Sequence, residues 1–118
     1  MTPDEQKPDA VVDLLRGTGT GPLWGMASRD LNATLLAWPP GHAVAEHANT
    51  EVDVLLVVLG GGGVVVIDQR KHALAPGHVL LVQKGSSRTI RAGTDGLRYL
   101  SVHKRRGPLT VAPRPEER

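Results

Sequence analysis

The sequence predicts an all-β protein of one domain, built as a sandwich or closed barrel of short strands. Its 118 residues, 40% of them hydrophobic, suit one domain with one core. Aromatic residues make up only 3% and Phe is absent, so the core must consist of Val, Leu and Ala. Branched Val packs well on a pleated sheet, and the 14 Gly and 9 Pro residues imply many turns.

The pattern along the chain predicts eight or nine strands and no long helix. Proline at positions 39 and 40 ends one strand, because Pro lacks the amide N–H that a ladder needs. The four glycines at 60–63 are expected to connect two strands, since a phosphate loop would end in Lys-Ser/Thr and lead into a helix. We expect a flexible N-terminal arm at 1–20, a barrel at 21–111 and a polar C-terminal tail at 112–118. The expected strands cover 23–28, 31–38, 42–47, 52–59, 64–67, 70–74, 78–82, 87–92 and 97–104.

The strand expected at 52–59 is apolar on both faces. One face carries Asp53, Leu55, Val57 and Leu59, and the other carries Val52, Val54, Leu56 and Val58. A half-exposed strand would alternate apolar with polar residues. The outer face is therefore expected to be covered, either by the N-terminal arm or by a second subunit, and a homodimer is predicted.

Composition also excludes several classes of protein. Without Cys, the chain can form neither a disulfide framework nor a thiolate metal site. The net charge of +2, a single dense basic run at 104–106 and only three aromatic residues argue against nucleic-acid binding. No apolar stretch approaches the length of a membrane span, and the first ten residues lack the layout of a secretory signal. A cytoplasmic protein without a membrane or nucleic-acid partner is expected.

Two spaced motifs between residues 41 and 92 carry a family resemblance. The first is Gly-x5-His-x-His-x3–4-Glu-x6-Gly, and the second is Gly-x5-Pro-x-Gly-x2-His-x3-Asn. The positions that match the first are Gly41, His47, Asn49, Asp53 and Gly60, and those that match the second are Gly77, Gln83, Gly85, Arg88 and Ala92. This spacing resembles the cupin family. The resemblance implies a cupin β-barrel, that is, a double-stranded β-helix or jelly roll.

The same resemblance implies a site where family members hold a metal with His, His, Glu and His. This chain offers His47, Asn49, Asp53 and Arg88 at those places. Arg88 cannot ligate, because its guanidinium stays protonated and has no lone pair; it is suited instead to pair with Asp53 or with a ligand carboxylate. The cofactor is therefore expected to be either none or one divalent transition metal.

One further residue is a candidate metal ligand. In the last expected strand, Leu97, Tyr99, Ser101 and His103 share a face. If that face points inward, His103 could complete a triad with His47 and Asp53, leaving positions open for water or substrate. Glu51 has the same parity as Asp53 and could also face the cavity.

Each of these residues also has a structural explanation. His47 could be a satisfied polar residue at the barrel mouth, and Asn49 and Asp53 could cap turns. Arg88 could form a structural ion pair with Asp53. The remaining histidines are expected to be ordinary, with His42 and His72 solvated and His78 in a loop.

Four functions remain open. The first is a barrel pocket that binds a small, possibly anionic ligand, lined by Leu55, Val57, Ile90 and Tyr99, with His47, Asp53 and Arg88 as polar anchors. The second is a metal-dependent enzyme of the dioxygenase or isomerase type. The third is a metal-free enzyme in which His47 moves a proton and Arg88 stabilises an anion. The fourth is an interaction module. Fold alone does not decide among them.

Overall fold

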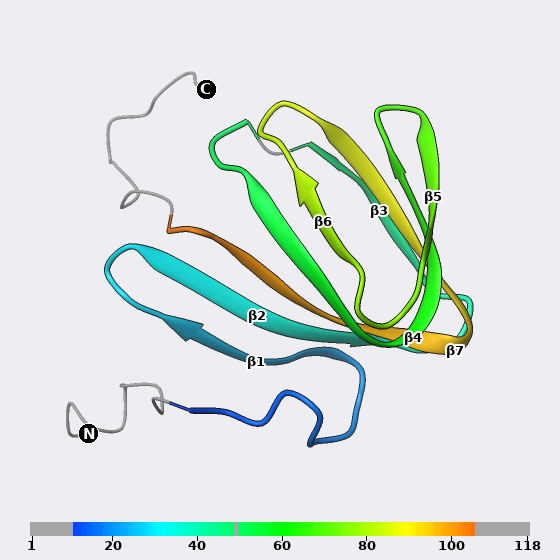
Figure 1. The fold of residues 1–118 in the computed structure, drawn as a ribbon, viewed down its shortest axis with the longest axis horizontal. Helices are drawn as coiled ribbons and strands as arrows, with labels where there is room; N and C mark the ends of the chain where they lie inside the picture. Colours follow the sequence, from blue (N-terminus) through cyan, green and yellow to red (C-terminus); the bar gives the residue numbers. More distant parts are fainter. Residues whose placement is uncertain (1–10, 49, 106–118) are drawn as a thin grey trace.

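The computed structural model describes residues 11–48 and 50–105, apart from the side chain of His47, and every regular element among them is a strand (Figure 1). No helix in this part of the chain is long and apolar enough to cross a membrane. The all-β prediction is confirmed. The strands are β1 (Gly21–Ala27), β2 (Leu31–Trp38), β3 (Ala43–Ala48), β4 (Val54–Ile67), β5 (Arg70–Leu74), β6 (Val79–Val82) and β7 (Ser87–Lys104).

Two long strands, β4 and β7, run through both layers of the molecule (Figure 1). The first part of β4 lies between β6 and the end of β7 and pairs with both. The end of β7 also pairs with β2, and β2 pairs with β1. The second part of β4 pairs with β5 and with the start of β7, which also pairs with β3. The first layer is therefore β1-β2-β7-β4-β6 and the second is β3-β7-β4-β5. This arrangement is consistent with the predicted jelly roll.

The number of strands differs from the prediction for a steric reason. The glycines at 60–63 lie inside β4 instead of joining two strands, and residues 93–96 likewise lie inside β7. A Cβ on Gly61 would come within 2.1 Å of the Gly96 carbonyl oxygen, and one on Gly63 within 2.2 Å of the Arg91 carbonyl oxygen. The bare glycines let β4 and β7 stay paired while both bend from one layer to the other, with register shifts at Gly60 and Gly63. Four expected strands are thus two, and seven strands are present among the described residues.

The core lies between the two layers. Residues opposite each other in a ladder face the same side of the sheet, and the inward partners in the first layer include Val58 opposite Tyr99. In the second layer, Val65 lies opposite Ile90. The buried cluster consists of Val52, Val54, Leu56, Val58, Val65, Leu74, Val82, Ile90, Ala92, Leu97 and Tyr99. Aliphatic side chains dominate this core, as the composition predicts.

The two layers form a sandwich and not a closed barrel. Within the described residues β1, β3, β5 and β6 each pair with one neighbour only. Of the two arrangements that the sequence left open, the structure has the sandwich, whose layers enclose one core.

The described part of the N-terminal arm is tied to the first layer. The Arg98 guanidinium donates from Nε to the Leu14 carbonyl oxygen at 3.0 Å and from Nη1 to the Gly17 carbonyl oxygen at 3.2 Å. Nη2 donates to the Arg16 carbonyl oxygen. One side chain of β7 thus donates to three backbone carbonyl groups of the arm, at residues 14, 16 and 17. Residues 1–10 and the predicted tail at 112–118 lie outside the described residues.

Candidate functional site

A cavity of about 370 Å³ opens between the two layers. Tyr99 and Arg88 both come from β7, one from each half of the strand, and Ile90 lies two residues beyond Arg88. The bend in β7 brings the two halves over the same space. The lining residues are Val44, Ala45, Glu46, Arg88, Ile90 and Tyr99. This cavity is mainly apolar, with a few polar groups, as small-molecule sites usually are.

Tyr99 supplies a phenol to this cavity. The Trp38 Nε1–H donates a hydrogen bond to the Tyr99 hydroxyl oxygen at 3.1 Å, so that oxygen is already an acceptor. Because a phenol carries one O–H donor as well, the Tyr99 proton remains available for another acceptor. Burial raises the pKa of Tyr99, while the Trp38 hydrogen bond and the Arg88 charge each lower it. The net shift is upward, so Tyr99 stays a neutral donor at physiological pH.

Arg88 brings a permanent positive charge to the same cavity. It lies opposite Ile67 in the β4 ladder and opposite His47 in the β3 ladder, and its side chain is half-buried. Its charge acts on the Tyr99 phenol electrostatically. The cavity thus combines a guanidinium and a phenol O–H with the apolar side chains of Val44 and Ile90. Glu46 also lines it, and its carboxylate accepts a hydrogen bond from the Ser87 hydroxyl.

The histidine after the second strand is not simply solvated. The rings of His42 and Trp38 stack with centroids 4.5 Å apart and planes 7° from parallel. His42 is half-buried, so the expectation that it is a solvated turn residue is wrong. The stack supports the indole that hydrogen-bonds Tyr99, and thereby positions the phenol.

The structure separates the other predicted site residues. Asp53 is exposed, and its Oδ1 accepts a hydrogen bond from the Lys84 amide at 2.8 Å. This fixes the turn between β6 and β7, the structural role weighed for Asp53 above. His103 faces inward with Tyr99, but its Nδ1 lies 2.8 Å from the Lys104 carbonyl oxygen. The side chain of His47 and all of Asn49 lie outside the described residues, so their predicted roles stay predictions.

Two predicted lining residues face the other way. Leu55 is 39% exposed and Val57 is half-buried, and both alternate with the buried Val54, Leu56 and Val58 along β4. They therefore point to the outer face of the first layer. The prediction that Leu55 and Val57 line the cavity is wrong. Val54 pairs with His103, which shares the inward face of β7 with Tyr99, so Val54, Leu56 and Val58 face inward and Leu55 and Val57 face outward.

The described residues do not make a metal centre. No group of three or more His, Cys, Asp or Glu side chains that could hold a metal ion occurs among them. Asp53 is engaged by a backbone amide, and Arg88 cannot act as a ligand. A metal hypothesis therefore depends on His47, whose side chain is not described.

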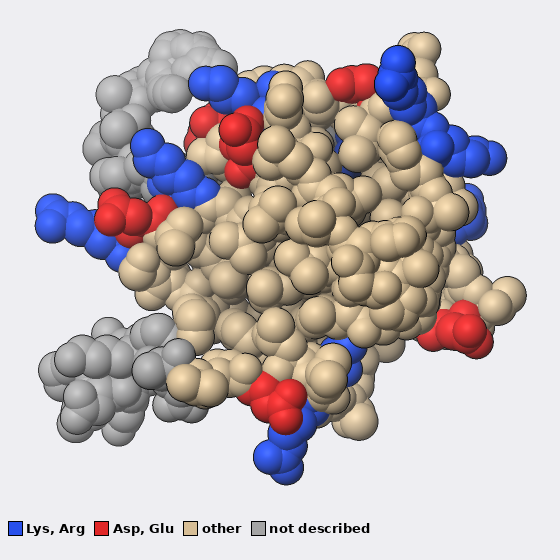
Figure 2. Space-filling model, in the orientation of Figure 1, with Lys and Arg blue, Asp and Glu red and all other residues tan. Residues whose placement is uncertain are grey.

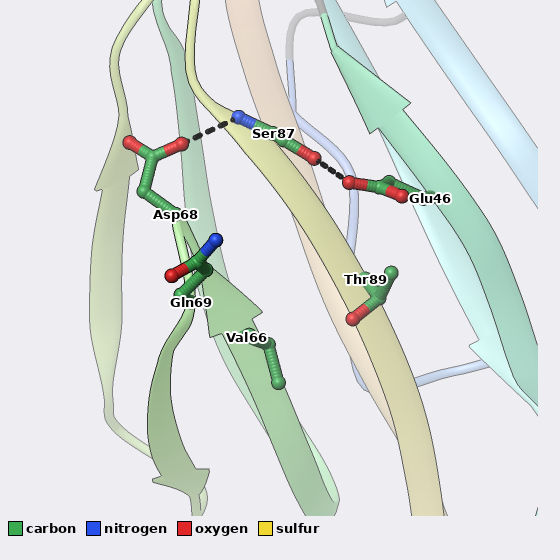
Figure 3. Close-up of a pocket in the computed structure, with 6 residues that line it drawn as sticks. All are labelled: Glu46, Val66, Asp68, Gln69, Ser87 and Thr89. Carbon is green, nitrogen blue, oxygen red and sulfur yellow. Dashed lines mark hydrogen bonds between the residues drawn. The ribbon is translucent and has the colours of Figure 1, made fainter.

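A second hollow, of about 350 Å³, lies on the outer face of the second layer (Figure 3). Ser87 stands between its two carboxylates: the Ser87 amide donates to Asp68 Oδ1 at 2.9 Å, and the Ser87 hydroxyl donates to Glu46. These bonds hold the β4–β5 turn and β3 to the start of β7. The hydrogen bond from the Ser87 amide, followed by one from the Ser86 side chain, lowers the pKa of Asp68. Both carboxylates thus have structural tasks.

Sequence reasoning missed three lining residues of the cavity, Val44, Ala45 and Glu46, and the Trp38 indole that donates to Tyr99. The three occupy unspecified positions of the first motif and Trp38 precedes it, so no motif position marks them. The pairing of Val44 with Ile90 and the bulge before His47 place this part of β3 beside the site. A pattern of strand periodicity alone does not give that bulge.

Comparisons with known proteins agree on the fold. No family model and no curated protein matches the chain. Among solved structures, the chain is similar to KdgF from Halomonas sp., at 19% identity and a TM-score of 0.67 over 71% of this chain and 77% of that one. It is also similar to a cupin protein from Bacteroides fragilis, at 22% identity and a TM-score of 0.63 over 78% and 80% of the two chains.

A third similar structure is a cupin superfamily protein from Desulfitobacterium hafniense, at 23% identity and a TM-score of 0.65. The match covers 83% of this chain and 94% of that one. The chain therefore has the fold of a small cupin domain, as its motif spacing predicted. Likeness at this level of identity concerns the fold and leaves the chemistry of the site to its own residues.

Proposed function

We propose that the cavity between the two layers binds a small organic anion with an apolar body. The observation that carries the proposal is that Arg88 and Tyr99 line the same mainly apolar cavity. The guanidinium fits a carboxylate, because its planar set of donors can hold both oxygens at once. The Tyr99 hydroxyl oxygen already accepts a hydrogen bond from Trp38, so the Tyr99 proton can donate a third hydrogen bond to the ligand.

The apolar part of the ligand would lie against Val44 and Ile90. A cavity of about 370 Å³ lies at the lower end of the range that small-molecule sites occupy. Burying the carboxylate beside a fixed guanidinium costs less than burying it alone, because the cation replaces part of its hydration. Short aliphatic or aromatic carboxylates are therefore the ligand class proposed.

The test is a thermal-shift screen of small carboxylates against their neutral amides. A ligand that binds only the folded state raises the melting temperature as its concentration rises above Kd. Arg88→Gln should abolish the shift and Tyr99→Phe should weaken it, whereas Arg91→Gln should leave it unchanged. Arg91 is a matched control, because it is an exposed arginine on the same strand. No carboxylate-dependent shift, or equal shifts with amides, would reject the proposal.

The two enzyme hypotheses are distinguished by metal content. Elemental mass spectrometry on untagged protein, purified without chelator, measures metal per chain. About one metal per chain, lost in His47→Ala, would favour a metal-dependent enzyme. Turnover that survives chelator and is lost in His47→Ala would favour a metal-free enzyme in which His47 moves a proton.

A further inference from the structure

The outer face of the first layer carries an uninterrupted apolar grid. One row of paired residues crosses the layer from β6 to β2. In it Leu81 pairs with Leu55, Leu55 pairs with Val102, and Val102 pairs with Ala33. The next row, two residues along, is apolar in the same way. The eight positions, which we call the outer grid, are Val79, Val57, Leu100 and Leu35 in one row and Leu81, Leu55, Val102 and Ala33 in the other.

The grid is open to solvent at its β6 end. Val79 is 60% exposed, Leu81 53% and Leu55 39%, whereas Leu35 at the β2 end is fully buried. No other described strand pairs with the free edge of β6. β6 has only four residues, and short length by itself protects an edge strand. The exposed apolar side chains on its outer face, and not its free edge, therefore indicate that another surface covers this part of the layer.

Charged side chains surround this uncharged area. In the orientation of Figure 1, Figure 2 shows Lys, Arg, Asp and Glu around the rim and none over the centre, where β4 and β6 lie. Beyond one end of the grid lie Asp53 and Lys104, and beyond the other lies Arg98. A rim that carries both signs does not repel a copy of itself, and the net charge of +2 is small.

We infer that a second copy of this chain covers the outer grid, so that two first layers pack face to face about a two-fold axis. A surface without polar groups recognises another apolar surface, and the molecule itself supplies one of matching size. In a two-fold dimer, the same patch serves as both partners. Sheets that pack in this way interdigitate their side chains.

The N-terminal arm does not fill this role. The Arg98 guanidinium, which lies beyond the grid, holds the described part of the arm by donating to three of the arm's backbone carbonyl groups. Residues 1–10 contain only one large apolar side chain, Met1, and are otherwise polar, Pro or Ala. Such a segment has too little apolar surface to cover Val79, Leu81 and Leu55.

The test is the mass of the full chain in solution by analytical ultracentrifugation at micromolar concentration. The wild-type chain should have twice its mass of 12.6 kDa. The double variant Val79→Lys/Leu81→Lys should have the single mass with an unchanged far-ultraviolet circular dichroism spectrum. Ala48→Lys is the matched control, because Ala48 is exposed on β3 in the other layer, and it should stay dimeric.

Two outcomes overturn the inference. One is a monomeric wild-type chain. The other is a double variant that keeps the dimer mass, which would place the interface elsewhere. Deleting residues 107–118, which contain Leu109 and Val111, tests the remaining internal occupant. The dimer should survive this deletion. If the complete chain is monomeric and associates only after the deletion, the tail, and not a second copy, covers the outer grid.

Discussion

Trp38 donates its indole N–H to the Tyr99 hydroxyl oxygen at 3.1 Å, across 61 residues of sequence. The bond joins the end of β2 to the middle of β7 at the wall of the cavity. It commits one side of the phenol to the protein and leaves the O–H for a ligand. Trp38 is itself stacked on His42, so the phenol is positioned by two packed rings.

The titration of Tyr99 tests this arrangement directly, because Tyr99 is the only tyrosine in the chain. Burial raises its pKa above the usual 10.0, and the Arg88 charge opposes that rise. Arg88→Gln removes a positive charge that favours phenolate, so it should raise the Tyr99 pKa further. Ultraviolet absorbance of the phenolate against pH measures both values.

The control for this titration is Arg91→Gln, which removes an arginine whose side chain is exposed. It should leave the Tyr99 pKa where the wild type has it. A Tyr99 pKa that does not move in Arg88→Gln would contradict the placement of Arg88 beside the phenol.

Stability at high pH should also depend on Tyr99. Since its folded pKa exceeds its unfolded value, near 10.0, the contribution of this group is fully present below that pH and is lost as pH rises through the folded pKa. Tyr99→Phe should be less stable near neutral pH by about 1 kcal/mol, because the Trp38 N–H loses its acceptor. The difference between the two proteins should shrink at alkaline pH. Urea unfolding over this pH range measures it, and a constant difference would contradict the linkage.

Strand periodicity and motif spacing predicted much of this molecule. The short strands with their turn signals and the spacing of the two motifs predicted the fold, and the second motif led to Arg88. Periodicity assigned the residues of the strand at 52–59 to two faces, but it did not show which face is inner. The inner face is the one whose residues, such as Val54 and Leu56, pack against the opposite layer. The continuity of β4 through 60–63 was missed because four glycines have weak strand propensity, and only the close approach of β7 explains them.

Arg98 should control the N-terminal arm. Arg98→Ala removes the donors to the Leu14, Arg16 and Gly17 carbonyl oxygens, and the arm then loses its described anchor. We expect trypsin to cleave after Arg16 several-fold faster, because cleavage requires local release of the backbone. Arg91→Ala is the control, since Arg91 makes a single 3.4 Å bond to the Gly41 carbonyl oxygen. Equal cleavage rates in Arg98→Ala and wild type would show that other contacts hold the arm.

The glycines inside β4 should differ sharply in their tolerance of a methyl group. Gly63→Ala places a Cβ 2.2 Å from the Arg91 carbonyl oxygen, which is rigid backbone, so β4 and β7 must separate. The expected loss of stability is more than ~2 kcal/mol, as for other overpacked sites. Gly60→Ala is the control, because its nearest contact would be the Arg98 Cβ at 3.8 Å. Urea unfolding that ranks the two variants equally would contradict the bend at Gly63.

The turn between β4 and β5 offers a stabilising change. Asp68 and Gln69 have φ values of 47° and 74°, in the left-handed region that favours glycine. Gln69→Gly should stabilise the protein by about 0.5–1 kcal/mol, since the relief of strain exceeds the added entropy of the unfolded chain.

Asp68→Gly relieves the same kind of strain but removes the carboxylate that accepts from the Ser87 amide at 2.9 Å. It should therefore gain nothing or lose stability. Its loss should diminish in acid, because the pKa of Asp68 is lowered by that bond and the contribution disappears as pH falls through the folded pKa. Urea midpoints at neutral and acid pH measure both variants. If Gln69→Gly destabilises the protein at neutral pH, the strain assigned to Gln69 is absent.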